Sequence, residues 1–135
     1  MIEKVTLQLT KGSHFKLEDS IRCEDMNPKA LLLLAAAKCA ALTVLHIMTK
    51  ERICPKRFEI SLSGELSTDT VQAESVFNAF HVVYNIECGA EKEQVKVSNA
   101  VRLAHDRHCG LLRMLRKIAP VSHEIAIVST EPANA

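Results

Sequence analysis

The feature that most constrains this chain is a long apolar stretch that follows an Asn-Pro pair and contains a cysteine. The stretch covers residues 28–42 and includes Cys39. Asn27 suits the N-cap because its side chain can accept a hydrogen bond from a free backbone N–H of the first turn. Pro28 suits the first helical position, where an N–H is not needed. We therefore expect a helix from Pro28 to about Glu51. Since apolar residues surround most of it, this helix should be central and buried.

The remainder of the chain shows strand and helix patterns in turn. Alternation of apolar and polar residues predicts strands near 5–10, 15–17, 58–66, 76–86 and 123–128. The polar turn at 67–73 indicates that strands 58–66 and 76–86 form a hairpin. Helical spacing predicts helices over 91–107 and 111–118, and residues 131–135 are expected to be a frayed tail. The order β-β-α-β-β-α-α-β indicates a single α+β domain over residues 1–135, with antiparallel sheet packed on the long central helix.

Composition excludes several classes of function. The 17 basic and 16 acidic residues leave a net charge of +1, which gives no electrostatic footprint for nucleic acid or an anionic membrane. The N-terminal residues alternate like a strand and lack the form of a signal peptide. The apolar run from Ala30 to Ala37 ends at Lys38 and is too short to cross a bilayer. We expect a soluble, cytoplasmic protein with no nucleic-acid or membrane partner.

Two of the five cysteines are placed where a thiol could react. The five are Cys23, Cys39, Cys54, Cys88 and Cys109. Their number is odd and their spacing is not that of metal ligands, so neither a disulfide framework nor a zinc site is expected. Cys109 lies at a helix boundary after Arg107 and His108, and positive charge or a helix N-terminus favours the thiolate. Two such thiols, if the fold brings them together, could run a peroxide-reducing cycle that ends in a disulfide.

Each candidate also has a simpler interpretation. A free cysteine is often buried and only packs, and this applies to Cys39 and Cys109 as well as to the other three. His105 and His108 are three residues apart, a spacing that could suit a metal, but no third ligand is evident. We therefore expect no metal and no bound cofactor.

The order of these motifs resembles that of the osmotically inducible protein C / organic hydroperoxide resistance (OsmC/Ohr) family, in particular its short OsmC-like branch. The resemblance rests on Asn27-Pro28, the segment Ala35-Ala36-Ala37-Lys38-Cys39 and Cys109 after an amphipathic helix, and it extends to about Val128. It implies an intertwined homodimer with two active sites at the subunit interface. It also implies a thiol-dependent peroxidase that acts in oxidative stress on organic hydroperoxides. By this analogy Cys39 attacks the peroxide, Cys109 resolves the sulfenic acid, and an external dithiol restores both thiols.

One departure from the family pattern leaves a second function open. In the better-characterised branch a glutamate follows the Asn-Pro pair and orders an arginine against the attacking thiolate, whereas here the position is Lys29. The candidates for the cationic partner are Arg22, Arg107 and His108. If the partner has been lost, the chain would be a non-catalytic OsmC-like dimer that senses redox state or binds a small molecule. A third alternative is a structural domain whose thiols only pack.

Overall fold

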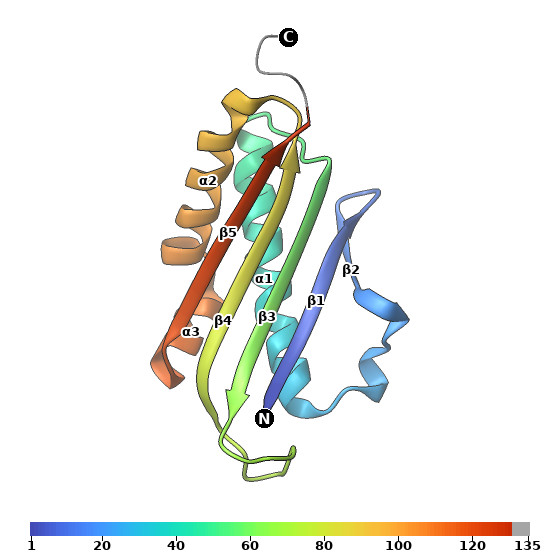
Figure 1. Ribbon diagram of the computed structural model, residues 1–135, viewed down its shortest axis with the longest axis vertical. Coiled ribbons are helices and arrows are strands. Elements are labelled where there is room, and N and C mark those ends of the chain that lie inside the picture. The colour runs from blue at the N-terminus through green and yellow to red at the C-terminus, as the bar shows by residue number, and fades with distance from the viewer. Residues whose placement is uncertain (131–135) are drawn as a thin grey trace.

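A computed structural model describes residues 1–130, and the tail expected at 131–135 lies outside them. One sheet is covered on one face by helices (Figure 1). The elements are β1 (Ile2–Thr10), β2 (His14–Leu17), α1 (Pro28–Lys50), β3 (Arg57–Leu66), β4 (Phe77–Cys88), α2 (Gln94–Leu103), α3 (Gly110–Ile118) and β5 (Val121–Ser129). The predicted α+β class and the long helix are confirmed, but the helix is buried on one side only, since Leu31 and Leu42 on its other side are exposed.

The five strands form one sheet in the order β2-β1-β3-β4-β5. The pairs from β2 to β4 are antiparallel, as predicted, but β5 runs parallel to β4, with Ile125 opposite Tyr84. A parallel pair needs a crossover connection, and the chain supplies one through α2 and α3 on one face of the sheet.

The start of α1 follows the predicted capping chemistry. The side-chain oxygen of Asn27 accepts a hydrogen bond of 2.9 Å from the backbone N–H of Ala30, and its amide donates to Glu3 of β1 at 3.2 Å. The cap therefore fixes the first turn of α1 and also joins it to the sheet. Lys29 extends this anchoring, because its ammonium donates to the carbonyl of Ala73 in the β3–β4 turn at 3.2 Å.

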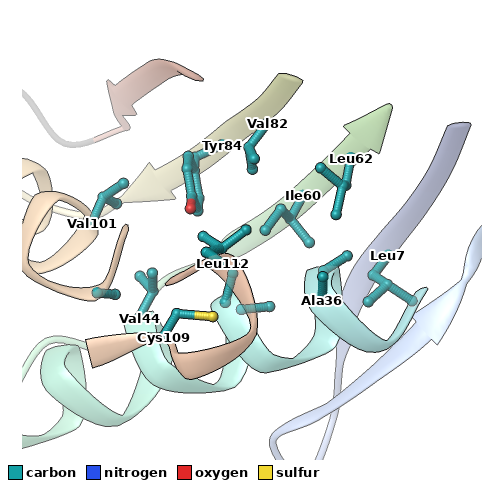
Figure 2. Close-up of a cluster of buried hydrophobic side chains, with 14 of the residues drawn as sticks. Leu7, Ala36, Val44, Ile60, Leu62, Val82, Tyr84, Val101, Cys109 and Leu112 are labelled. Atoms are coloured by element: carbon teal, nitrogen blue, oxygen red, sulfur yellow. The ribbon is translucent and has the colours of Figure 1, made fainter. Parts of the chain in front are cut away.

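The core lies between α1 and the sheet. Leu33, Ala37 and Val44 of α1 are fully buried and belong to the same apolar core cluster as Ile60 and Leu62 of β3. Figure 2 shows how side chains of the helices and of β3 and β4 fill this space. Packing of this kind supplies most of the stability of a helix in water.

The same helix meets the length and composition criteria for a membrane span. The run from Ala30 to Ala37 is short, but α1 as a whole has 23 residues and is long and apolar enough to cross a bilayer. The sequence prediction considered the short run alone, and the complete helix passes this test of length and composition. In this fold, however, one side of α1 is packed on the sheet, as expected for the core helix of a globular domain.

The helix predicted over 91–107 is interrupted. It consists of a 3₁₀ turn at Glu91–Glu93, helix α2, and a π-helical turn at Ala104–His108. The backbone N–H of Cys109 closes the π-helical turn on the carbonyl of Ala104 at 2.8 Å. This hydrogen bond joins residues five apart, one more than in an α-helix, so the turn contains an additional residue. Helix α3 begins directly after it, with Cys109 at the N-cap position.

Candidate active site

The fold brings Cys39 and Cys109 together although they lie 70 residues apart in the chain. Cys39 is in the middle of α1, and Cys109 stands at the start of α3. Their sulfur atoms are 3.2 Å apart, with the thiol of Cys109 as donor and the sulfur of Cys39 as acceptor. Two thiols in contact can form a disulfide with little movement of the backbone.

The two thiols have different surroundings. Cys109 is fully buried and belongs to the apolar cluster drawn in Figure 2. Cys39 is only partly buried, although its helical neighbours Ala36 and Ala40 are completely covered. The hydroxyl of Thr43 donates to the carbonyl of Cys39 at 2.7 Å, which holds the helix without engaging the thiol. A reagent from solution therefore reaches Cys39 first.

Burial controls the protonation of Cys109. It raises the pKa of this thiol to about 12, and the neighbouring thiol of Cys39 acts in the same direction. The backbone N–H groups of Leu112 and Leu111, in the first turn of α3, lower the pKa but do not compensate for burial. Cys109 is thus an uncharged S–H donor at neutral pH. A donor of this kind stabilises negative charge on the sulfur that it faces.

The three predicted cationic partners do not meet the thiols within one chain. Arg22 is exposed in the loop before α1 and forms an ion pair with Glu24. Figure 1 shows this loop near the β2 edge of the sheet, whereas α3 is near the β5 edge. Arg107 and His108 are close to Cys109 in sequence, but both are exposed in the π-helical turn. Within residues 1–130 none of the three forms a hydrogen bond to either sulfur.

Sequence reasoning missed a buried polar pair beside Cys109. The hydroxyl of Tyr84 lies 2.8 Å from Nδ1 of His105, and both side chains are buried. Burial, together with His123 and Arg116, lowers the pKa of His105 to about 4, so its ring is neutral at neutral pH. Tyr84 occupies the inward face of the alternating strand β4. That position was the available signal, because a buried tyrosine hydroxyl usually needs a hydrogen-bond partner.

Comparison with protein-family models matches residues 21–124 to a family described as OsmC-like protein. This chain belongs to the OsmC-like family. The matched segment includes both thiols, the Asn-Pro helix start and the π-helical turn. The resemblance inferred from the sequence motifs is therefore confirmed.

Solved structures support the same fold. An OsmC-like protein from Mycoplasma pneumoniae has a TM-score of 0.62 and 15% identity, over 95% of this chain and 96% of that chain. An organic hydroperoxide resistance protein OsmC from Legionella pneumophila has a TM-score of 0.58 and 17% identity, over 82% and 73% of the two chains. The organic hydroperoxide resistance protein OhrB of Bacillus subtilis has a TM-score of 0.52 and 17% identity, over 93% and 97%. At these identities the likeness shows the fold. The comparison with curated proteins finds no match.

Proposed function

We propose that this OsmC-like protein is a thiol-dependent peroxidase that reduces organic hydroperoxides through Cys39 and Cys109. The observation that carries the proposal is the 3.2 Å contact between the two sulfur atoms. The names of the Legionella and Bacillus structural neighbours, which refer to organic hydroperoxide resistance, support the choice of substrate class. The apolar surroundings of the site also favour an alkyl hydroperoxide over hydrogen peroxide.

The reaction proceeds in three balanced steps. The Cys39 thiolate attacks the distal oxygen of the hydroperoxide, the O–O bond breaks, and the alkoxide leaves and is protonated to the alcohol. Cys39 is then a sulfenic acid, the first reversible stage of thiol oxidation. The Cys109 thiol attacks this sulfur, and water is released as the disulfide forms. An external dithiol reduces the disulfide and completes the cycle.

The assignment of roles follows from exposure and charge. The attacking sulfur must be reachable from solution and must carry negative charge, and Cys39 is the more exposed of the two thiols. Cys109 is buried and protonated at neutral pH. Its S–H group, which donates to Cys39, supports the charge that the attack requires. The reverse assignment would place the nucleophile where neither solvent nor substrate reaches it.

A second copy of the chain is expected to complete the site. Leu31, Ala35, Cys39, Leu42 and His46 recur on one exposed face of α1. Leu31 and Leu42 are 38% and 41% exposed, although both belong to a long apolar helix. A homodimer would bury this face and would enclose the open side of Cys39. The cation that one chain does not supply to the thiols would then come from the partner.

The decisive experiment is oxidation with a stoichiometric alkyl hydroperoxide. We expect an intramolecular disulfide between Cys39 and Cys109, detected by mass spectrometry as the loss of two hydrogen atoms. Cys39→Ser should abolish peroxide consumption, whereas Cys109→Ser should leave a sulfenic acid that dimedone captures. Cys54→Ser, at an exposed cysteine, is the matched control and should behave as the parent. Peroxide consumption by Cys39→Ser at the parent rate would refute the assignment.

One observation favours a second candidate function. The ion pair of Arg22 with Glu24, and the exposure of Arg107 and His108, leave the thiol pair without a hydrogen-bonded cation in the described part of the chain. A slow thiol would suit a redox sensor or a small-molecule-binding dimer better than an enzyme. Repeated turnover with an excess of hydroperoxide and dithiothreitol separates the two. A single oxidation without turnover would indicate the sensor.

A further inference from the structure

A buried hydrogen bond lies beside Cys109 and has no part in the peroxide chemistry. It joins the Tyr84 hydroxyl to Nδ1 of His105 at 2.8 Å, between side chains that are 0% and 2% exposed. Each of these groups would be costly to bury without a partner, so each constrains the position of the other. Tyr84 belongs to β4, and His105 belongs to the turn that follows α2. The bond therefore ties the segment before Cys109 to the sheet.

The π-helical turn transmits this constraint to the thiol. Its closing bond runs from the N–H of Cys109 to the carbonyl of Ala104 at 2.8 Å, around His105. The carbonyl of His105 accepts a hydrogen bond from the guanidinium of Arg116 in α3. The turn is thus held through a side chain on one side and through its backbone on the other. Cys109 stands where the turn and α3 meet, so its position depends on both contacts.

Tyr84 and His105 are both uncharged at neutral pH, which suits a hydrogen bond that persists. The ring of His105 also packs against His123, with centroids 4.1 Å apart. The low pKa of His105 and the raised pKa of Tyr84, which burial causes in both, keep the two groups neutral at neutral pH. Neither group exchanges a proton readily near neutrality. Their hydrogen bond is therefore suited to holding a structure in place and unsuited to acid or base catalysis.

We propose that Tyr84, His105 and Arg116 are positioning residues for the disulfide-forming step. They hold the thiol of Cys109 against Cys39, and the inference rests on the proposed function for its place in the cycle. In this step the S–S bond forms and the S–O bond of the sulfenic acid breaks. The hydroxyl group leaves as water with the proton of the Cys109 thiol. The three residues act only through the position of Cys109: directly on the closing of the disulfide, and on the attack only through the S–H group that Cys109 donates to Cys39.

The first test uses no peroxide. Parent and Tyr84→Phe are equilibrated in dithiothreitol redox buffers, and the fraction of Cys39–Cys109 disulfide is measured by mass spectrometry. We expect Tyr84→Phe to lower the equilibrium constant for disulfide formation by about two- to tenfold, the range that one net hydrogen bond represents. Ser61→Ala is the matched control, since it removes a buried hydroxyl pair with Thr6 elsewhere in the sheet. It should leave the constant unchanged.

A second pair of variants acts on the other contact. Arg116 is only partly buried, so Arg116→Gln keeps the test usable if Tyr84→Phe does not fold. It should also weaken the disulfide, whereas Lys117→Gln, an equal loss of charge at the next residue, should not. His105→Asn keeps an amide near the position of Nδ1 and should stay close to the parent. In peroxide assays, Tyr84→Phe and Arg116→Gln should increase capture of the sulfenic acid by dimedone, because the thiol that resolves it is held less firmly.

The outcomes separate this inference from the proposed function. Equilibrium constants within experimental error of the parent for both Tyr84→Phe and Arg116→Gln would overturn the positioning role. A parent chain that forms no disulfide in oxidising buffer would overturn it as well. Shifted constants in a chain that consumes no peroxide would support the positioning role and refute the peroxidase.

Discussion

Replacement of Gly64 by alanine should destabilise the fold through a specific collision. Gly64 lies in β3, opposite Phe80 of β4. A Cβ at this position would be 2.4 Å from Cε1 and 2.5 Å from Cδ1 of Phe77, well inside any real contact. The Phe77 ring is buried and packs on Phe80 with centroids 4.9 Å apart, so it has little freedom to move away.

The size of the effect follows from two opposing terms. Forcing an extra methyl into a packed core costs about 1–3 kcal/mol. Replacing a strand glycine by alanine returns about 0.5–1 kcal/mol, because the unfolded chain loses conformational freedom. The short distances place the collision near the top of its range. We therefore expect Gly64→Ala to lower the free energy of unfolding by about 2 kcal/mol.

Urea denaturation followed by circular dichroism, at one fixed protein concentration, measures this loss. Gly110→Ala is the matched control, because a Cβ there meets nothing within 4 Å. It lies in the first turn of α3 and should be neutral or slightly stabilising. Adding Phe77→Leu to Gly64→Ala should recover part of the loss, in a double-mutant cycle with a clear interaction energy. A Gly64→Ala variant as stable as the parent would show that the reasoning from the collision is wrong.

Three further predictions follow from other parts of the fold. Asn27→Ala should lower the free energy of unfolding by about 1 kcal/mol, since it removes the cap of α1, and urea titration would detect this. Folding lowers the pKa of His105 from 6.5 to about 4, so the unfolded chain binds more protons than the folded chain between these pH values. The free energy of unfolding should therefore fall as the pH decreases from about 6.5 to about 4. His105→Asn should reduce this dependence, which thermal melts at several pH values would measure. Light scattering should give about twice the chain mass of 15.0 kDa, and Leu42→Asp should shift the protein towards the monomer. A parent protein that has the mass of one chain in solution would contradict the proposed interface.

The parts of the fold that depend on local chemistry could be predicted from the sequence. The start of α1 is an example, because the Asn27 cap and Pro28 act within a few residues of each other. The strands of the antiparallel part of the sheet were also visible as alternation. The parallel direction of β5 was not, since it depends on the path of the whole crossover through α2 and α3. No pattern within a few residues records that path.

The candidate site was predictable only in part, for the same reason. Periodicity indicated that Cys39 is in a helix and Cys109 at a helix boundary, but their contact was suggested by family resemblance. The buried partner of Tyr84 could not be identified because His105 lies in a π-helical turn, which departs from regular helical spacing. Arg22 is a candidate for the thiols by sequence, and its ion pair with the nearby Glu24 cannot be read from composition.

The separation of the two thiols along the chain has a consequence for unfolding. A disulfide between Cys39 and Cys109 would close a loop spanning 70 positions, about half of the protein. Restricting an unfolded chain by a loop of this size is worth about 4 kcal/mol in the chain-entropy description. Oxidation would therefore make the protein markedly harder to denature and to digest. Protein that has been oxidised would then resist protease more than reduced protein, even after the oxidant has been removed.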